Sequence, residues 1–105
     1  MGSLTPIGCF DFVANTKKLV FLDFWASWCQ PCKAIDTAIE RLKPRFEEKV
    51  SFGKLNVDDY PEVAEEYQVL ALPTIILARQ GKEIDRIVGW HSESDLAARI
   101  EKALG

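Results

Sequence analysis

The sequence predicts an α/β protein in which helices cover a central mixed β-sheet. Segments rich in β-favouring residues alternate along the 105-residue chain with segments whose apolar residues recur at helical spacing. A long helical segment joins the first two strand segments, which predicts a parallel pair, and a short Gln80-Gly81 turn joins the last two, which predicts a hairpin. No linker, repeat or low-complexity segment interrupts this order, so we expect one domain over residues 1–105.

The beginning of the chain is expected to form a helix and then a strand. Thr5-Pro6 has the form of a helix cap followed by a first-turn proline, and apolar residues at helical spacing continue to about Asn15. Leu19 to Trp25 is an almost continuous run of apolar, β-favouring residues, as in a strand that is buried on both faces. Asp23 is the one charged residue in this run.

A long helix is expected from Pro31 onward. Its apolar stripe has helical spacing and consists of Ile35, Ala38, Ile39, Leu42 and Phe46. Pro44 lies within this stripe and lacks the N–H that would bond to the carbonyl of Glu40, so we expect it to bend or end the helix.

The rest of the chain is expected to add three strands and two helices. The strands are expected at Ser51–Val57, Thr74–Ala78 and Glu83–Gly89. Asp59-Tyr60-Pro61 should start a helix that carries Val63, Ala64 and Tyr67. Ser92 should cap the last helix, with Asp95 three residues further on, and this helix should bury Leu96, Ile100 and Leu104.

The composition excludes several classes of function. With 48% hydrophobic and 28% charged residues and a formal charge of -3, the chain is not suited to nucleic acid or an anionic membrane as its main partner. The longest apolar stretch, Val69–Ala78, is interrupted by Pro73 and is too short to cross a bilayer. We find no charged-then-apolar leader, so we expect a cytoplasmic protein.

Three cysteines are too few for a disulfide framework, and one close pair with one odd thiol, Cys9, indicates redox chemistry. A structural zinc site needs about four ligands, and Cys9 and His91 are the only further soft ligands in the sequence besides the pair. We therefore expect no metal and no bound cofactor. We further expect Cys9 to be a half-buried structural thiol and His91 to be a solvated loop residue.

The close pair lies in Trp28-Cys29-Gln30-Pro31-Cys32, at the junction of the first strand and the long helix. A thiolate at a helix N-terminus faces unpaired backbone N–H groups and the positive end of the helix dipole, which lower the pKa of a cysteine placed there. We expect Cys29, as the more exposed thiol, to attack a substrate disulfide. Cys32, one turn inside the helix, should then resolve the mixed disulfide.

Asp23 is expected to be a buried acid. Burial without a partner raises the pKa of a carboxyl, and such a group next to a cysteine pair suits a general base that takes the proton of Cys32. Lys54 in the neighbouring predicted strand is the expected charge partner. The alternatives are that the strand turns Asp23 to solvent and that Lys54 is an ordinary surface lysine.

Leu72-Pro73-Thr74 places a proline at the start of a buried strand. This position indicates a special backbone, for which a cis Leu72-Pro73 bond is one explanation and a trans proline ending a loop is the alternative.

These motifs together resemble the thioredoxin family over nearly the whole chain. The resemblance rests on Asp23 to Lys33 (DFWASWCQPCK), Lys54 to Asp58, Leu72-Pro73-Thr74 and Val88-Gly89. It implies a thioredoxin-like three-layer sandwich, with a central mixed sheet of four strands flanked by four helices. The family's fifth strand, at the N-terminal edge, would be short or missing, because only Met1 to Thr5 precede the first helix.

The resemblance also implies roles for individual residues. Cys29 and Cys32 would be the redox couple, Asp23 the buried acid with Lys54 as its neighbour, and Pro73 a cis-proline facing the disulfide. Protein substrates would lie in a groove lined by Trp28, Gln30, Pro31, Leu72, Pro73, Gly89 and Trp90.

Three residues depart from the family pattern. Gln30 stands where glycine is typical, between the cysteines, where it affects the stability of the thiolate. Thr37 replaces a proline that often bends the long helix, so the bend is expected further along, near Pro44. Trp90 replaces a small residue and should crowd or extend the substrate groove.

We therefore expect a monomeric protein disulfide reductase, a general redox carrier that is recharged by a separate thioredoxin-reductase-like electron donor. One alternative is a thiol oxidant or disulfide isomerase of the same fold, although no histidine lies between the cysteines to stabilise a thiolate. The other is a binding module that uses the surface of Trp28, Leu72 and Trp90 without turnover.

Overall fold

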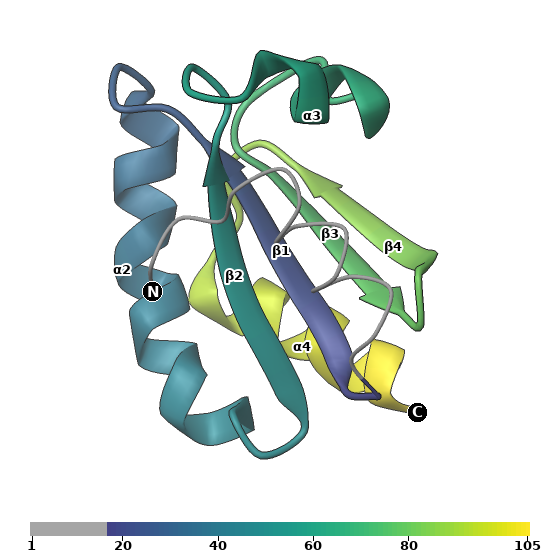
Figure 1. Cartoon of the computed structure of the whole chain (residues 1–105). Helices are drawn as coiled ribbons and strands as arrows, with labels where there is room; N and C mark the ends of the chain where they lie inside the picture. The colour runs from purple at the N-terminus through teal and green to yellow at the C-terminus, as the bar shows by residue number, and fades with distance from the viewer. Residues whose placement is uncertain (1–16) are drawn as a thin grey trace.

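The computed structural model describes residues 17–105, and a mixed four-stranded sheet forms its centre (Figure 1). The strands are β1 (Leu19–Trp25), β2 (Val50–Asn56), β3 (Thr74–Arg79) and β4 (Lys82–Val88). Their order across the sheet is β2-β1-β3-β4. β1 is parallel to β2 and antiparallel to β3, and β3 is antiparallel to β4, so the predicted mixed sheet and hairpin are confirmed.

Helices lie on both faces of this sheet (Figure 1). They are α2 (Gln30–Phe46), α3 (Pro61–Glu66) and α4 (Glu93–Leu104). α2 and α4 pack on one face and α3 packs on the other, which gives the expected three layers. The helix expected from Thr5 to about Asn15, the short or missing edge strand before it, and Cys9 all lie outside the described residues.

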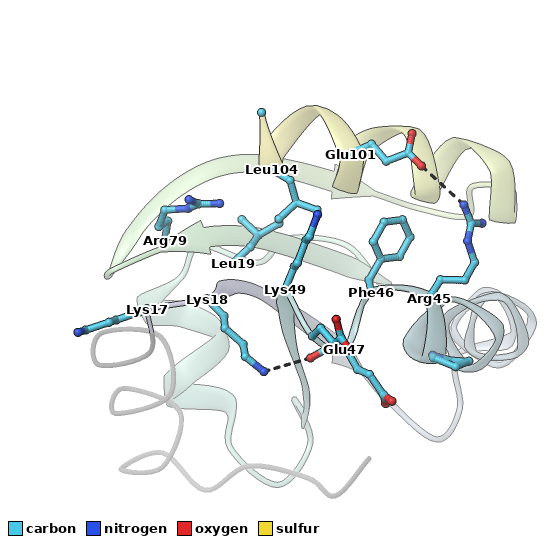
Figure 2. Close-up of a pocket in the computed structure, with 13 residues that line it drawn as sticks. Lys17, Lys18, Leu19, Arg45, Phe46, Glu47, Lys49, Arg79, Glu101 and Leu104 are labelled. Atoms are coloured by element: carbon cyan, nitrogen blue, oxygen red, sulfur yellow. Dashed lines mark hydrogen bonds and ion pairs between the residues drawn. The ribbon is translucent and has the colours of Figure 1, made fainter.

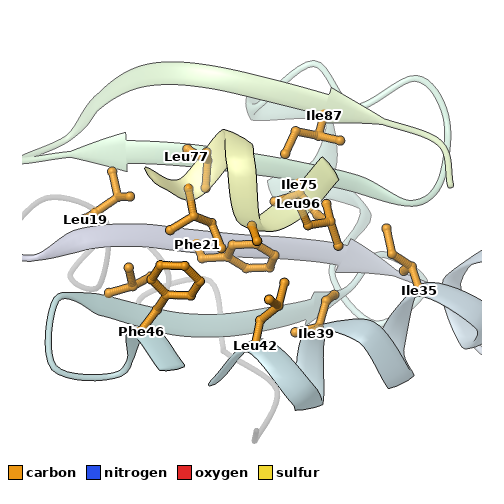
Figure 3. Packing of buried hydrophobic residues seen from close by; sticks show 13 residues of the cluster. Leu19, Phe21, Ile35, Ile39, Leu42, Phe46, Ile75, Leu77, Ile87 and Leu96 are labelled. Carbon is orange, nitrogen blue, oxygen red and sulfur yellow. The ribbon is translucent and has the colours of Figure 1, made fainter. Parts of the chain in front are cut away.

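The larger apolar cluster lies between the sheet and helices α2 and α4 (Figure 3). In β1, Leu19 and Phe21 belong to this cluster, whereas Val20 and Leu22 belong to a second cluster on the α3 side. The alternation follows from the two-residue period of a strand. The two clusters show that β1 is buried on both faces, as its apolar run predicted. Asp23 follows Phe21 by two residues and therefore lies on the same face of the strand.

The Gln80-Gly81 turn, the end of α2 and the start of α4 lie where the sequence has local signals. At the Gln80-Gly81 turn both residues have positive φ, 51° and 82°, as in the type I′ turn of a tight hairpin. α2 continues through Pro44 and ends two residues later. Ser92 Oγ accepts a hydrogen bond from the Asp95 N–H at 3.2 Å, so Ser92 caps α4 as expected.

α3 is shorter than expected, because Tyr67 lies just beyond its end. Arg86 in β4 donates to the carbonyls of Tyr67 and Gln68, at 2.8 and 3.1 Å, and also binds the Glu83 carboxylate at 2.8 Å. Gln68 has a φ of 55°. The Tyr67 and Gln68 carbonyls therefore accept hydrogen bonds from Arg86 of β4, and the chain turns away from the axis of α3.

Candidate active site

The cysteine pair lies where β1 ends and α2 begins. The chain leaves β1 at Trp25, and the Cys29 N–H bonds to the Ala26 carbonyl at 3.1 Å. Cys29 then caps α2 with extended backbone angles, and Pro31 occupies the first turn, where its missing N–H costs no helical hydrogen bond. The strand-to-helix junction that the sequence predicted therefore positions both cysteines.

Cys29 and Cys32 form a disulfide, with their Cα atoms 5.3 Å apart. Cys29 Sγ also accepts a hydrogen bond from the Cys32 N–H at 3.1 Å. The two residues are equally buried, at 4% exposure, so the expectation that Cys29 would be the more exposed is wrong in this oxidised form. What distinguishes them is position, because Cys29 precedes the helix and Cys32 lies within its first turn.

The start of α2 favours negative charge on sulfur. Backbone N–H groups there lack helical partners, and the helix dipole has its positive end at this point. The first turn of α2 contains no acidic residue that would oppose a thiolate. A thiolate at Cys29 is therefore stabilised by the Cys32 N–H that already points to its sulfur.

Asp23 is buried, with 2% exposure, on the sheet face that α2 covers. Its Oδ1 has no hydrogen-bond partner. Desolvation by burial raises the pKa of the Asp23 carboxyl to about 7, while the positive charge of Lys54 lowers it and the negative charge of Asp36 raises it. Asp23 is thus a buried acid and does not turn to solvent.

Lys54 is the register partner of Asp23 across the parallel β1–β2 pair. Its ammonium, however, makes its ion pair with Asp36 of α2, at 3.4 Å from Oδ1, and lies 4.4 Å from the centre of the Trp25 ring. The expected pairing of Lys54 with Asp23 is therefore wrong as a direct contact, and only a longer-range attraction acts between them. Its side chain is 17% exposed, so it is not an ordinary surface lysine.

The Leu72-Pro73 peptide bond is cis, the first of the two alternatives for this motif. Leu72 packs against the small cluster of Ala26, Cys29 and Cys32, which places the Leu72-Pro73 segment next to the disulfide. The Pro73 carbonyl accepts the Gly89 N–H at 2.8 Å. Gly89 has a φ of 84°, so any other residue would be strained at this turn, although no atom beyond the two chain neighbours lies within 4 Å of the position that its Cβ would occupy.

Exposed apolar side chains surround this region. Trp28 is 64% exposed and Trp90 is 58% exposed. The Trp28 indole N–H donates to Asp58 Oδ2 at 2.8 Å, which fixes the ring beside the disulfide. Gln30 is exposed at the start of α2, as is Pro31.

Sequence reasoning missed several residues near this site. Asp36 binds Lys54 and lies in no motif. Asp58 ends the Lys54 to Asp58 motif, but nothing in the sequence reveals its contact with Trp28. Leu70 is 96% exposed in the loop before Leu72, and its place in the apolar stretch Val69–Ala78 gave no sign of this exposure.

His91 lies in the loop before α4, as expected, but its side chain is 29% exposed and is held by neighbouring groups. Its Nδ1 lies 2.6 Å from Asp95 Oδ2 and its Nε2 lies 3.2 Å from the Val88 carbonyl oxygen. The imidazole is therefore held between α4 and the end of β4, next to Trp90.

A surface hollow lies at the other end of the sheet (Figure 2). It is lined by the start of β1, the α2–β2 connection and the end of α4, with Leu19, Phe46 and Leu104 among its residues. Arg45 and Glu101 form an ion pair at 3.6 Å on one side. Because Leu19 begins the strand whose far end leads to Cys29, this hollow is separate from the redox site.

The described residues also limit other kinds of site. Within residues 17–105, histidine, cysteine and acidic side chains form no group of three or more that could hold a metal ion. No helix in the same range is both long and apolar enough to cross a bilayer.

A disulfide that closes across the first turn of a helix, on an α/β sandwich and beside a cis-proline segment, defines a dithiol–disulfide redox site. Comparison with known proteins identifies its family. The thioredoxin family model matches residues 6–102. Thioredoxin H2 of Arabidopsis thaliana is 42% identical over 93 residues, which cover 89% of this chain and 68% of that protein. A thioredoxin of Staphylococcus aureus is 40% identical over 95 residues, which cover 90% of this chain and 91% of that protein.

A solved structure agrees with these relatives. The crystal structure of the Malassezia sympodialis thioredoxin matches with a TM-score of 0.83 and 36% identity, covering 91% of this chain and 84% of that one. The chain therefore belongs to the thioredoxin family. It is a thiol-disulfide oxidoreductase, and its Cys29–Cys32 pair makes it a dithiol–disulfide redox carrier.

Proposed function

We propose that the protein is a cytoplasmic reductant of protein disulfides that is recharged by a separate thioredoxin-reductase-like donor. The observation that carries this proposal is the Cys29–Cys32 disulfide at the start of α2, with the Cys32 N–H bonded to Cys29 Sγ. This arrangement favours a thiolate at Cys29 in the reduced protein, and the thiolate is the form that attacks disulfides.

The reaction transfers two electrons in two exchange steps. The Cys29 thiolate attacks one sulfur of a substrate disulfide, so that a mixed disulfide forms and the other substrate sulfur leaves as a thiolate. Cys32 then loses its proton and attacks Cys29 Sγ. The Cys29–Cys32 bond forms, the mixed disulfide breaks, and the second substrate thiolate leaves. The substrate is reduced and the protein is oxidised to the form seen in the structure.

Asp23 is the group to which we assign the proton of Cys32. It lies on the sheet face covered by α2, whose first turn contains Cys32, and its raised pKa of about 7 suits a base that works near neutral pH. Lys54 modulates this acid through its charge and makes no direct contact with it.

The substrate groove is assigned to residues around the disulfide, of which four are exposed, Leu72 and Gly89 are half-buried and Pro73 is buried. Trp28, Gln30 and Pro31 would form the side contributed by the start of α2. Leu72, Pro73, Gly89 and Trp90 would form the opposite side, where the Gly89 N–H to Pro73 carbonyl bond joins the two segments. The exposed indoles offer apolar contact area to a polypeptide that carries a disulfide.

We further infer that residues 1–105 form one domain and that the protein acts as a monomer without nucleic-acid or membrane partners. The family model extends over residues 6–102, which supports a single domain. The formal charge of -3 gives no attraction to nucleic acid or to anionic lipid.

The test is the reduction potential of the Cys29–Cys32 couple, measured by thiol alkylation across a series of redox buffers in a Cys9→Ser background. A potential near or below about -250 mV supports a reductant. A value near about -180 mV or higher would identify an oxidant or isomerase of the same fold.

Cysteine variants test the order of the steps. Cys32→Ser should accumulate a mixed disulfide between Cys29 and a substrate protein, whereas Cys29→Ser should form none. If Cys29→Ser kept full partner binding and full biological activity, the protein would be a binding module and turnover would not be its main role.

A further inference from the structure

The ion pair of Lys54 has a consequence for the buried acid. Lys54 is the register partner of Asp23, yet its ammonium lies 3.4 Å from Asp36 Oδ1 and against the Trp25 ring. Asp23 Oδ1 has no hydrogen-bond partner. The lysine that could neutralise the buried carboxylate is thus engaged by a second carboxylate, which belongs to α2.

Asp36 is placed to act on both the acid and the thiol chemistry. It follows Cys32 by four residues, so the two lie one turn apart on the same side of α2. Its side chain is 39% exposed and keeps contact with water, whereas Asp23 is 2% exposed. A hydrated carboxylate at this position stays charged at low cost, while the buried one does not.

The charged groups around Asp23 come from two elements. Lys54 of β2 attracts its carboxylate form and Asp36 of α2 repels it. The register partner on the third strand, β3, is the apolar Ile75. In the reduced protein the Cys32 thiol, in the first turn of α2, is a further titratable group on the helix that covers Asp23.

We propose that Asp36 is a positioning residue for disulfide exchange: it holds the Lys54 ammonium away from Asp23, so that the buried carboxylate can accept the proton of Cys32. This inference rests on the role assigned to Asp23 above. The proton passes from Cys32 Sγ to Asp23, and the resulting thiolate attacks Cys29 Sγ and displaces the substrate thiolate. Asp23 then releases the proton to water.

Without Asp36, the electrostatic changes around Asp23 all favour its charged form. Lys54 is free to move toward its register partner, and the repulsion by Asp36 is also lost. Both changes favour the Asp23 carboxylate and lower its pKa. A base of lower pKa accepts a proton from a thiol less readily, so resolution by Cys32 becomes slower near neutral pH.

The first measurement is the titration of the Asp23 carboxyl by carbon NMR in the oxidised protein. Asp36→Asn should move its midpoint to lower pH, by about half a pH unit or more. Glu40→Gln is the matched control, because it removes the same charge one turn further along α2, where Glu40 pairs with Lys43. Glu40→Gln and the conservative Asp36→Glu should both leave the midpoint close to that of the wild type.

The second measurement follows the reaction itself. The reduced protein, in a Cys9→Ser background, is mixed with an aromatic disulfide that releases coloured thionitrobenzoate. Attack by Cys29 releases the first thionitrobenzoate and resolution by Cys32 releases the second. Asp36→Asn should move the pH profile of the second phase in the same direction as the Asp23 midpoint, and leave the profile of the first phase unchanged.

A double-variant cycle with Lys54→Met tests whether Asp36 acts through the lysine. The effect of Asp36→Asn on the Asp23 midpoint should be smaller when Lys54 is absent. An equal effect with and without Lys54 would overturn the positioning role.

The remaining outcomes separate this inference from the proposed function. An unchanged Asp23 midpoint in Asp36→Asn overturns the inference and leaves the reductase function intact. A shifted midpoint with an unshifted second phase overturns the role of Asp23 in resolution, and with it the role of Asp36. If the wild type released no second thionitrobenzoate at all, the proposed two-step function would fail instead.

Discussion

Replacing Asp23 with asparagine should stabilise the folded protein by an amount that grows with pH. Burial raises the pKa of Asp23 from 3.8 to about 7 in the folded protein, so the folded state holds a proton that the unfolded state has already lost. The stability associated with this neutral carboxyl is complete below pH 3.8 and is lost as the pH rises to about 7. An asparagine amide stays neutral throughout and has no such loss.

The size of the effect follows from the two pKa values. One pKa unit corresponds to about 1.4 kcal/mol, and the linkage relation between pH 5 and pH 8 gives a loss of about 2 to 3 kcal/mol for wild-type Asp23. The free energy of unfolding of the Asp23→Asn variant, relative to wild type, should therefore rise by this amount over the same interval. Urea unfolding of the oxidised proteins at pH 5, 6, 7 and 8 measures it directly.

Asp59→Asn is the control for this experiment. Asp59 is exposed and its replacement removes the same charge, so its stability curve should run parallel to that of the wild type. Parallel curves for the Asp23→Asn variant and the wild type from pH 5 to pH 8 would refute the reasoning, because Asp23 would then have the same pKa in the folded and unfolded states.

Three further substitutions test other parts of the structure. Arg86→Ala should lower the free energy of unfolding, measured by urea unfolding, by about 1 to 3 kcal/mol, since two carbonyls after α3 lose their charged donor. Arg79 is exposed, and the control Arg79→Ala should change this free energy by less than about 0.5 kcal/mol. Ile39→Ala in the larger core should cost about 2 to 5 kcal/mol, visible as a lower Tm; a smaller loss would mean that the core closes around the cavity. Trp28→Phe loses the bond to Asp58 and should reduce kcat/KM for insulin reduction about fivefold, with little change in unfolding; equal kcat/KM would remove this bond from substrate binding.

The sequence predicted the elements of residues 17–105 well because their signals are local. The apolar run of β1, the stripe of α2, the Gln80-Gly81 turn and the Ser92 cap each depend on neighbouring residues. The end of α3 was misplaced because its cause is distant. Arg86 lies 19 residues after Tyr67 and binds its carbonyl, and no local pattern reveals that contact.

The site shows the same division. Spacing and residue type are enough to identify Cys29, Cys32 and the Leu72-Pro73 motif from the sequence. The partner of Lys54 could not be predicted, because strand pairing places Lys54 beside Asp23 whereas the contact with Asp36 depends on how α2 approaches β2. The relative exposure of the cysteines also depends on packing, by Leu72 and Ala26 among others.

The stability cost of Asp23 and its chemical use have one physical origin. A carboxyl oxygen without a hydrogen bond, in an apolar layer, resists ionisation and so weakens the folded state at neutral pH. A hydrogen bond or a direct ion pair with Lys54 would remove that cost, but it would also stabilise the carboxylate and make it a poorer proton acceptor. Because Lys54 pairs with Asp36 instead, the stability cost of the buried Asp23 remains, and its ability to accept a proton is preserved. An acid kept in this state is consistent with selection for proton transfer over stability.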